Sequence, residues 1–152
     1  MRYFPMKKGL LFILLCVLAI PSITYSAIIS DHTRIDITQV PESAILLAKA
    51  NLHIAYGHTS HGSQITSGMT GLVAFMNDKG YPHNLYLWNN GGTDGALDLH
   101  DRAMGGDVGY YPNWVNYTRS YLGTPDPATG RGTNHADVNV IMWSWCGQVD
   151  SK

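Results

Sequence analysis

Apolar positions recur along the chain with a spacing typical of helices. In residues 63–79 the apolar side chains fall at offsets of 4, 3, 1 and 3, on one helix face, and Gly80 follows where helices often end. Residues 41–50 contain good helix formers after a proline, and residues 112–122 are followed by a glycine. The pattern therefore predicts three helices over these ranges.

Short apolar runs between these helices predict strands. They cover residues 52–56, 84–88 and 138–143, and the last run is apolar enough to be buried on both faces of a sheet. Strands that alternate with helices through Gly- and Asn-rich turns are typical of an α/β fold. We therefore predict a three-layer α/β domain with a mainly parallel sheet.

The N-terminus has a different character from the rest of the chain. Arg2, Lys7 and Lys8 precede an uncharged apolar stretch, and small residues lead to Ser26. This order is typical of a secretory signal peptide, and the apolar stretch is shorter than a membrane span, so a retained anchor is the weaker alternative. We predict a signal peptide over residues 1–26, a secreted or periplasmic location without stable membrane insertion after cleavage, and one domain over residues 27–152.

Composition narrows the class of protein and of partner. The 152 residues are 45% hydrophobic and 14% charged, which excludes a disordered tail and a coiled-coil rod. The formal net charge is −1 and no basic run follows residue 8, so a nucleic-acid partner is not expected. Of the two cysteines only Cys146 lies beyond the predicted signal peptide, so no intrachain disulfide is expected.

Ligands of parallel sheets bind at the carboxyl ends of the strands. This rule selects three polar or Gly-rich segments, at residues 57–63, 89–95 and 144–148. In the first of them Ser60 is a candidate nucleophile, because N–H groups at the start of the following helix can stabilise a developing oxyanion. The simpler alternative is that Ser60 or Ser63 only caps that helix, and Ser63 fits this role better.

His58 and His61 are also candidate metal ligands, since they lie three residues apart. A zinc site needs three or four ligands. Four other histidines show no ligand spacing: His53, His83, His100 and His135. Four acidic residues do not match a calcium loop and are predicted to lie in a solvated connection: Asp94, Asp98, Asp101 and Asp107. No metal or other cofactor is predicted, although a metal-dependent hydrolase that uses His58 and His61 stays an alternative.

The segment Gly-His-Thr-Ser-His-Gly, between a predicted strand and a predicted helix, resembles the first block of the SGNH (GDSL-type) hydrolase superfamily. The likeness is to its divergent branch, which carries H-x-S-x-G, and it implies that Ser60 is the nucleophile. Residues 90–95 are similar to the second block, N-x-G-x-x-G, which includes Asn90 and Gly92 and implies that the Gly95 N–H group contributes to the oxyanion hole. The superfamily has an α/β fold of the flavodoxin-like kind.

The third block of that superfamily, G-x-N-D, is replaced here by Ser-Trp-Cys-Gly-Gln, in which Cys146 or Gln148 stands closest to the asparagine donor. The catalytic acid and histidine of the superfamily belong to a D-x-x-H block, which this sequence does not contain. We therefore expect the chain to be the N-terminal part of a longer protein, nearly inactive by itself unless His58 or His61 acts as a local base.

The resemblance implies an exported serine esterase that acts on small-molecule or glycan esters. His58, His61, Asn90, Gly92 and Trp145 are the candidate substrate-binding residues. Aromatic residues that stack on sugar rings would also suit a non-catalytic carbohydrate-binding or surface protein on the same fold, although most of them are expected to fill the core. Cys146 is a rival nucleophile, or a small buried apolar residue.

Overall fold

The structure is a computed structural model that describes residues 31–106 and 108–145. The predicted signal peptide over residues 1–26 and the candidate residues Cys146 and Gln148 lie outside these ranges. Within the described ranges, no helix is both long enough and apolar enough to cross a bilayer.

The chain divides into two compact units, Met1–Asp36 and Ile37–Lys152. In the described part of the first unit, the Asp31 carboxylate accepts hydrogen bonds from the N–H and hydroxyl groups of Thr33. The second unit contains the sheet. Its elements in chain order are η1 (Ile37–Gln39), α2 (Glu42–Asn51), β1 (His53–Gly57), η2 (Ser60–Gly62), α3 (Ser63–Asp78), β2 (Trp88–Asn89), η3 (Thr93–Gly95), β3 (Leu97–Asp101), α4 (Asn113–Leu122) and β4 (Val140–Trp143).

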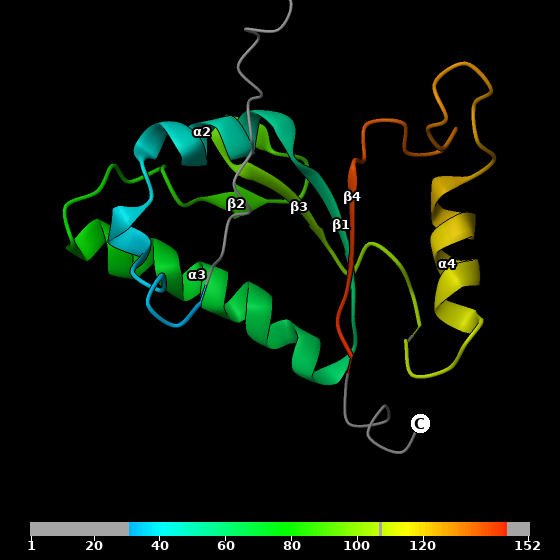
Figure 1. Cartoon of the computed structure of the whole chain (residues 1–152), viewed down its shortest axis with the longest axis horizontal. Coiled ribbons are helices and arrows are strands. Elements are labelled where there is room, and N and C mark those ends of the chain that lie inside the picture. The colour runs from blue at the N-terminus through cyan, green and yellow to red at the C-terminus, as the bar shows by residue number, and fades with distance from the viewer. Residues whose placement is uncertain (1–30, 107, 146–152) are drawn as a thin grey trace, which may run out of the picture. The chain divides into compact units, whose positions relative to one another are not determined.

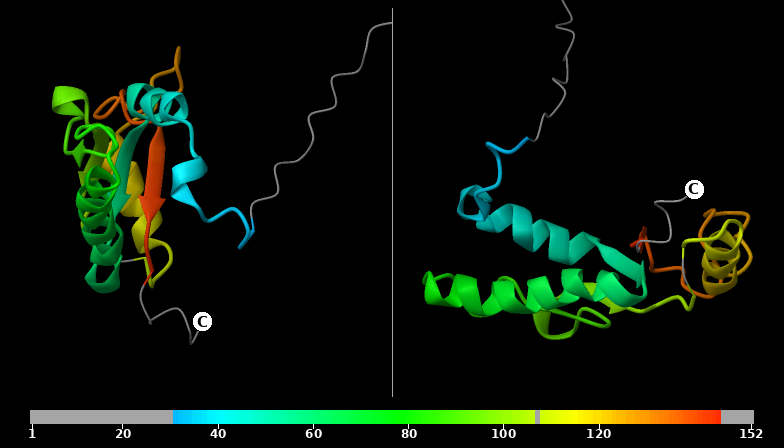
Figure 2. Two further views of the ribbon diagram at one scale, coloured as in Figure 1. Left: turned by 90° about the vertical axis from the view of Figure 1, so that its left-hand side faces the viewer. Right: turned by 90° about the horizontal axis from the view of Figure 1, so that it is seen from below.

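The four strands form one sheet in the order β2-β3-β1-β4, and every neighbouring pair is parallel (Figure 1). Side chains of β1 alternate between its two faces. Ile54 and Tyr56 belong to a core against which Met69 of α3 packs, whereas Ala55 belongs to a core against which Tyr121 of α4 packs. Figure 2 shows α2 and α3 on one side of the sheet and α4 on the other. The predicted α/β fold with three layers is confirmed.

The three predicted helices are confirmed to within one residue at each end. Gly123 follows α4 with a φ of 78°, which explains why that helix stops there. The predicted cap of α3 is corrected, because Ser63 is the first residue of the helix and not its N-cap. The Ser63 hydroxyl instead donates a hydrogen bond to the carbonyl oxygen of Ser60.

The predicted strands need three corrections. The run at residues 84–88 is mostly a turn, and only Trp88–Asn89 forms β2. The run at residues 138–143 yields β4, but β4 lies at the edge of the sheet and is only half-buried. The acidic stretch contains a strand, β3, in which Asp98 is buried, so the prediction of a solvated connection is wrong for this part.

Candidate functional site

Ser60 lies on a sharp turn at the carboxyl end of the sheet. β1 ends at Gly57 and the chain passes through η2 directly into α3, which begins where β1 and β4 end (Figure 1). Ser60 is exposed, and its φ of 42° lies in the left-handed region that residues with a Cβ rarely adopt. Such a conformation costs on the order of 1 kcal/mol or more.

A His–Asp pair, with the imidazole buried and the carboxylate partly exposed, joins the strand ends next to this turn. His58 follows β1 and its side chain is fully buried, while Asp101 is the last residue of β3. The His58 Nε2 atom lies 2.7 Å from Asp101 Oδ1, and because a carboxylate only accepts hydrogen bonds, Nε2 is the donor. His58 Nδ1 is buried and has no hydrogen-bond partner among the described residues. The Tyr56 ring packs on His58, with centroids 4.6 Å apart.

Gly62 allows the turn to approach these groups closely. A Cβ atom on Gly62 would lie 2.3 Å from His58 Cβ and 2.7 Å from Ser144 Oγ. Ser144 follows β4, and its N–H group donates to the Gly57 carbonyl oxygen at 3.2 Å. The turn that carries Ser60 is therefore held against the ends of both β1 and β4.

The second predicted block lies at the other end of the sheet. Gly95 precedes β3, whereas Ser60 follows β1, and in the parallel register Tyr56 pairs with Asp101. The rise along β3 from Leu97 to Asp101 alone separates the two ends by about 13 Å. The predicted oxyanion hole of Ser60 and Gly95 is therefore not assembled, because β2 is so short that the chain after it returns to the start of β3.

Two further predicted residues lie in the same connection as Gly95. Asn90 is exposed, and Gly92 has a φ of 63° and packs against Asp98, where a Cβ on the glycine would lie 3.0 Å from the Asp98 Cβ. The N–H group of Gly91 donates to Asp98 Oδ1 at 2.9 Å. Asn90 and Gly92 are thus not brought together with Ser60.

His61 and Trp145, the other described candidates, are exposed and lie in segments that follow β1 and β4. The expectation that most aromatic residues fill the core is wrong for four of them, which are 40–81% exposed: Tyr110, Tyr111, Tyr117 and Trp145. Tyr110 and Tyr111 come between the end of β3 and the start of α4. The carboxyl edge therefore presents aromatic side chains as well as Ser60.

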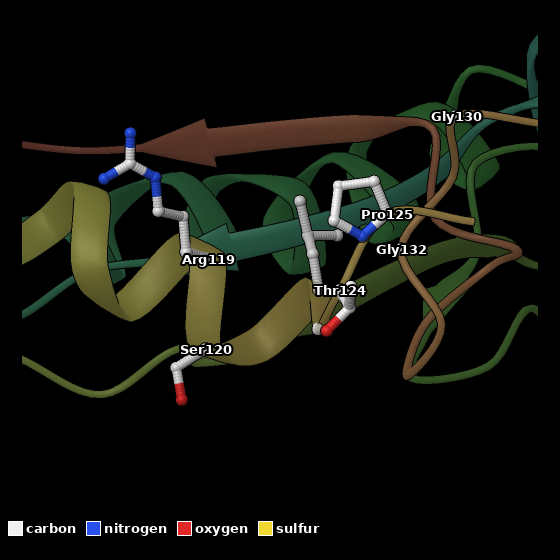
Figure 3. Close-up of a pocket in the computed structure, with 8 residues that line it drawn as sticks. Arg119, Ser120, Thr124, Pro125, Gly130 and Gly132 are labelled. Carbon is white, nitrogen blue, oxygen red and sulfur yellow. The ribbon is translucent and has the colours of Figure 1, made fainter. Parts of the chain in front are cut away.

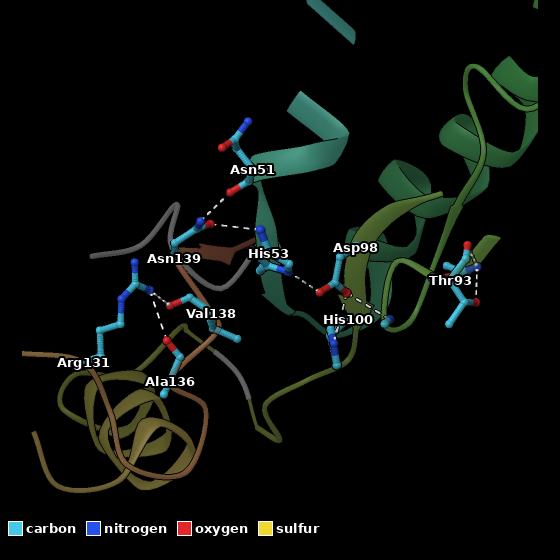
Figure 4. A network of polar contacts seen from close by, with 11 residues as sticks. Asn51, His53, Thr93, Asp98, His100, Arg131, Ala136, Val138 and Asn139 are labelled. Carbon is cyan, nitrogen blue, oxygen red and sulfur yellow. Dashed lines mark hydrogen bonds and ion pairs between the residues drawn. The ribbon is translucent and has the colours of Figure 1, made fainter. Parts of the chain in front are cut away.

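Sequence reasoning missed a second His–Asp network, centred on Asp98 (Figure 4). His53 Nδ1 lies 2.8 Å from Asp98 Oδ2, and His100 Nε2 lies 3.1 Å from Asp98 Oδ1. Within the described ranges, one group of three His, Cys, Asp or Glu residues is close enough to hold a metal ion, and it consists of His53, Asp98 and Asp137. The alternation of apolar and polar residues in Leu-Asp-Leu-His was the signal that could have revealed this strand.

A separate open pocket of about 560 Å³ lies between the end of α4 and the loop that follows it (Figure 3). None of the candidate residues lines it. Its lining residues are Arg119, Ser120, Leu122, Gly123, Thr124, Pro125, Gly130 and Gly132.

Comparisons with protein-family models, with curated proteins and with solved structures found no match. The function of the chain is therefore inferred from the Ser60 turn and the His58–Asp101 pair next to it.

Proposed function

We propose that the protein is an exported serine-dependent ester hydrolase in which Ser60 is the nucleophile. The observation that carries the proposal is the exposed serine at φ 42° on the turn between β1 and α3. Capping does not account for this strained backbone, since α3 has no side-chain cap. The backbone at Ser60 turns its carbonyl oxygen toward the Ser63 N–H and hydroxyl groups, whereas its exposed side chain has no part in capping α3 and is available for chemistry.

In the proposed reaction the Ser60 oxygen forms a bond to the ester carbonyl carbon while its proton passes to a base. The alcohol then leaves with a proton, and water hydrolyses the acyl-enzyme, which restores the serine. His58 does not contact substrate in this scheme, because its side chain is fully buried and its Nε2 is engaged by Asp101. It is a positioning residue for the turn. The candidate base in this chain is the exposed His61, which is next to Ser60 in the sequence.

The oxyanion needs donors at the same edge of the sheet as Ser60. The Ser60 N–H group is the first donor, and a second must come from segments that follow β3 or β4. Each such donor is worth about 3 kcal/mol of activation free energy. Gly95 does not supply this donor, because it precedes β3 at the opposite end of the sheet.

The exposed aromatic residues at the carboxyl edge favour esters of carbohydrates among the substrates. Tyr111 is 81% exposed and Trp145 is 60% exposed, and rings of this kind stack on the apolar faces of sugars. The same observation favours a second candidate function, in which the protein binds glycans at this edge without catalysis.

A fluorophosphonate label, followed by peptide mapping, tests the proposal in the 152-residue chain and in any longer product of the gene. We expect the label on Ser60, loss of labelling in Ser60→Ala, and a fall of roughly 10⁴-fold or more in kcat/KM for p-nitrophenyl acetate. The matched control is Ser67→Ala, because Ser67 is an exposed serine on α3. If no form is labelled, and glycan binding is the same in Ser60→Ala, the binding function is correct instead.

A further inference from the structure

We infer that the sheet carries a site for one divalent metal ion, formed by the His53 imidazole and the carboxylates of Asp98 and Asp137. One ligand atom from each of these residues lies within 4.8 Å of the other two. His53 begins β1, Asp98 is the second residue of β3, and Asp137 belongs to the loop before β4. Three segments that are distant in sequence therefore meet at this group.

The backbone around the ligands is held by hydrogen bonds (Figure 4). The His53 N–H group donates to the Asn139 side-chain oxygen at 2.9 Å, and the Asn139 N–H group donates to the His53 carbonyl oxygen at 3.0 Å. The Arg131 guanidinium donates to the carbonyl oxygens of Ala136 and Val138, on either side of Asp137. The loop that carries the third ligand is thus fixed next to the first.

The donor set selects the class of cation. One imidazole and two carboxylates suit zinc and similar transition metals, which bind nitrogen and oxygen at about 2.0–2.2 Å, better than calcium, which takes oxygen ligands. Ligands at such lengths around a tetrahedral ion lie about 3.3 Å apart. His53 Nδ1 and Asp98 Oδ2 lie 2.8 Å apart and all three ligand atoms lie within 4.8 Å, so small side-chain movements that open this pair and bring Asp137 closer would seat the ion. Asp98 is only 5% exposed, and a buried carboxylate gains strongly from a cation.

Tyr121 gives an independent reason to expect a ligand here. Its hydroxyl is buried and has no hydrogen-bond partner among the described residues, although such groups are nearly always paired. Tyr121 packs against the core cluster that contains Ala55 and Val138, and Val138 follows Asp137 directly in the chain. A water molecule bound to the metal would give this hydroxyl the partner that it lacks.

The position of the site indicates a structural role. It lies where β1 begins, whereas Ser60 follows the end of β1, so the metal has no part in the proposed ester hydrolysis. A bound ion would tie β1 and β3 to the loop before β4. His100 and the Gly91 N–H group also contact the Asp98 carboxylate and would orient it, as outer contacts of metal ligands commonly do.

Titration of EDTA-stripped protein with Zn²⁺ and with Co²⁺ tests the inference. We expect one equivalent to bind, with a thermal midpoint raised by on the order of 10 °C at a hundred times the Kd. The Co²⁺ complex should show d–d bands without a band from a thiolate ligand. Asp137→Asn and His53→Gln should each weaken Kd at least about tenfold. Both changes are suited to the test because Asp137 is exposed, the His53 side chain is 39% exposed, and Gln keeps a polar group beside Asp98.

Asp78→Asn and His83→Gln are the matched controls and should keep the Kd of the unchanged protein, since both residues are exposed and neither belongs to the group. The inference is overturned if the protein binds neither ion, if both ligand variants keep the original Kd, or if a thiolate band appears. Metal loading should leave fluorophosphonate labelling of Ser60 unchanged. A failure of the metal site is therefore distinguishable from a failure of the proposed hydrolase.

Discussion

Two His–Asp networks lie in the same sheet, and their burial is reversed. In the pair at the carboxyl end the His58 side chain is fully buried, while the Asp101 side chain is 32% exposed. In the other network the Asp98 side chain is 6% exposed, while the His53 side chain is 39% exposed. The first pair faces the α3 side of the sheet and the second faces the α4 side, as the alternation along β3 requires.

This reversal indicates in which network the loss of a partner costs more stability. A buried carboxylate with several donors around it is costly to leave without them, and it is the natural binding partner of a cation. Breaking the pair between a buried imidazole and a half-exposed carboxylate costs less free energy, because water can hydrate the acid. We therefore expect the Asp98 network to dominate stability and the His58 pair to position the Ser60 turn.

The largest expected effect comes from comparing Asp98→Asn with Asp101→Asn. Removal of the buried charge at Asp98 leaves His53, His100 and Gly91 without an anionic acceptor, and we expect a loss of about 3 kcal/mol in the free energy of unfolding. Asp101→Asn should cost about 1 kcal/mol, because water compensates its donor. Urea unfolding of both variants in EDTA gives the two values. Equal losses would contradict the dependence of stability on burial of the carboxylate.

Much of the fold could be predicted because its helices have a regular apolar period. The α3 face and the helix ends marked by Gly80 and Gly123 are local signals, and they do not depend on distant partners. β3 was missed because Asp98 and His100 make the segment look like a polar connection. Its leucines alternate with the buried Asp98 and the partly buried His100, which pair with each other, while Asp98 also pairs with His53.

The candidate site could be predicted only in part. The turn that presents Ser60 follows from a strand, a Gly-rich polar segment and a helix, which are adjacent in the sequence. The pairing of His58 with Asp101 depends on the register of β1 against β3, which no local pattern contains. Gly95 was expected beside Ser60 because residues 90–95 resemble the second block of the SGNH superfamily, which follows a strand. Here β2 is only Trp88–Asn89, and the chain after it does not reach the carboxyl edge.

Ser60→Gly is expected to have a smaller effect, in which stability rises while activity is lost. Glycine adopts a φ of 42° without the penalty that a Cβ brings, so the free energy of unfolding should rise by about 1 kcal/mol while ester hydrolysis is lost. Urea unfolding and p-nitrophenyl acetate hydrolysis measure the two quantities. Ser63→Gly, at a helical position, should instead destabilise by roughly 0.5–1 kcal/mol. A destabilised Ser60→Gly would show that the serine side chain has a structural use.

The smallest effect is expected at Tyr121, on the α4 side of the sheet. Burial and the two nearby carboxylates raise the pKa of Tyr121, so the folded protein keeps this phenol protonated at a pH where the unfolded chain ionises it. The stability that comes from the neutral phenol is fully present below about pH 10 and is lost as the pH rises through the folded pKa. Tyr121→Phe should therefore lose less stability between pH 9 and 11, which urea midpoints at several pH values measure.

The Tyr121→Phe variant is also informative at neutral pH. Without metal the Tyr121 hydroxyl has no partner among the described residues, so its removal should change the free energy of unfolding by less than about 1 kcal/mol. Burial also raises the pKa of Tyr86, which lies outside the Asp98 network. Tyr86→Phe is therefore the matched control for the alkaline slope, by which we mean the decrease of the free energy of unfolding between pH 9 and 11. An identical alkaline slope in Tyr121→Phe and the unchanged protein would contradict the closeness of this hydroxyl to Asp98 and Asp137. Both carboxylates raise the pKa of Tyr121, and neither raises the pKa of Tyr86. Zn²⁺ bound between Asp98 and Asp137 should therefore reduce the alkaline loss of stability that depends on Tyr121 and leave the loss that depends on Tyr86 unchanged.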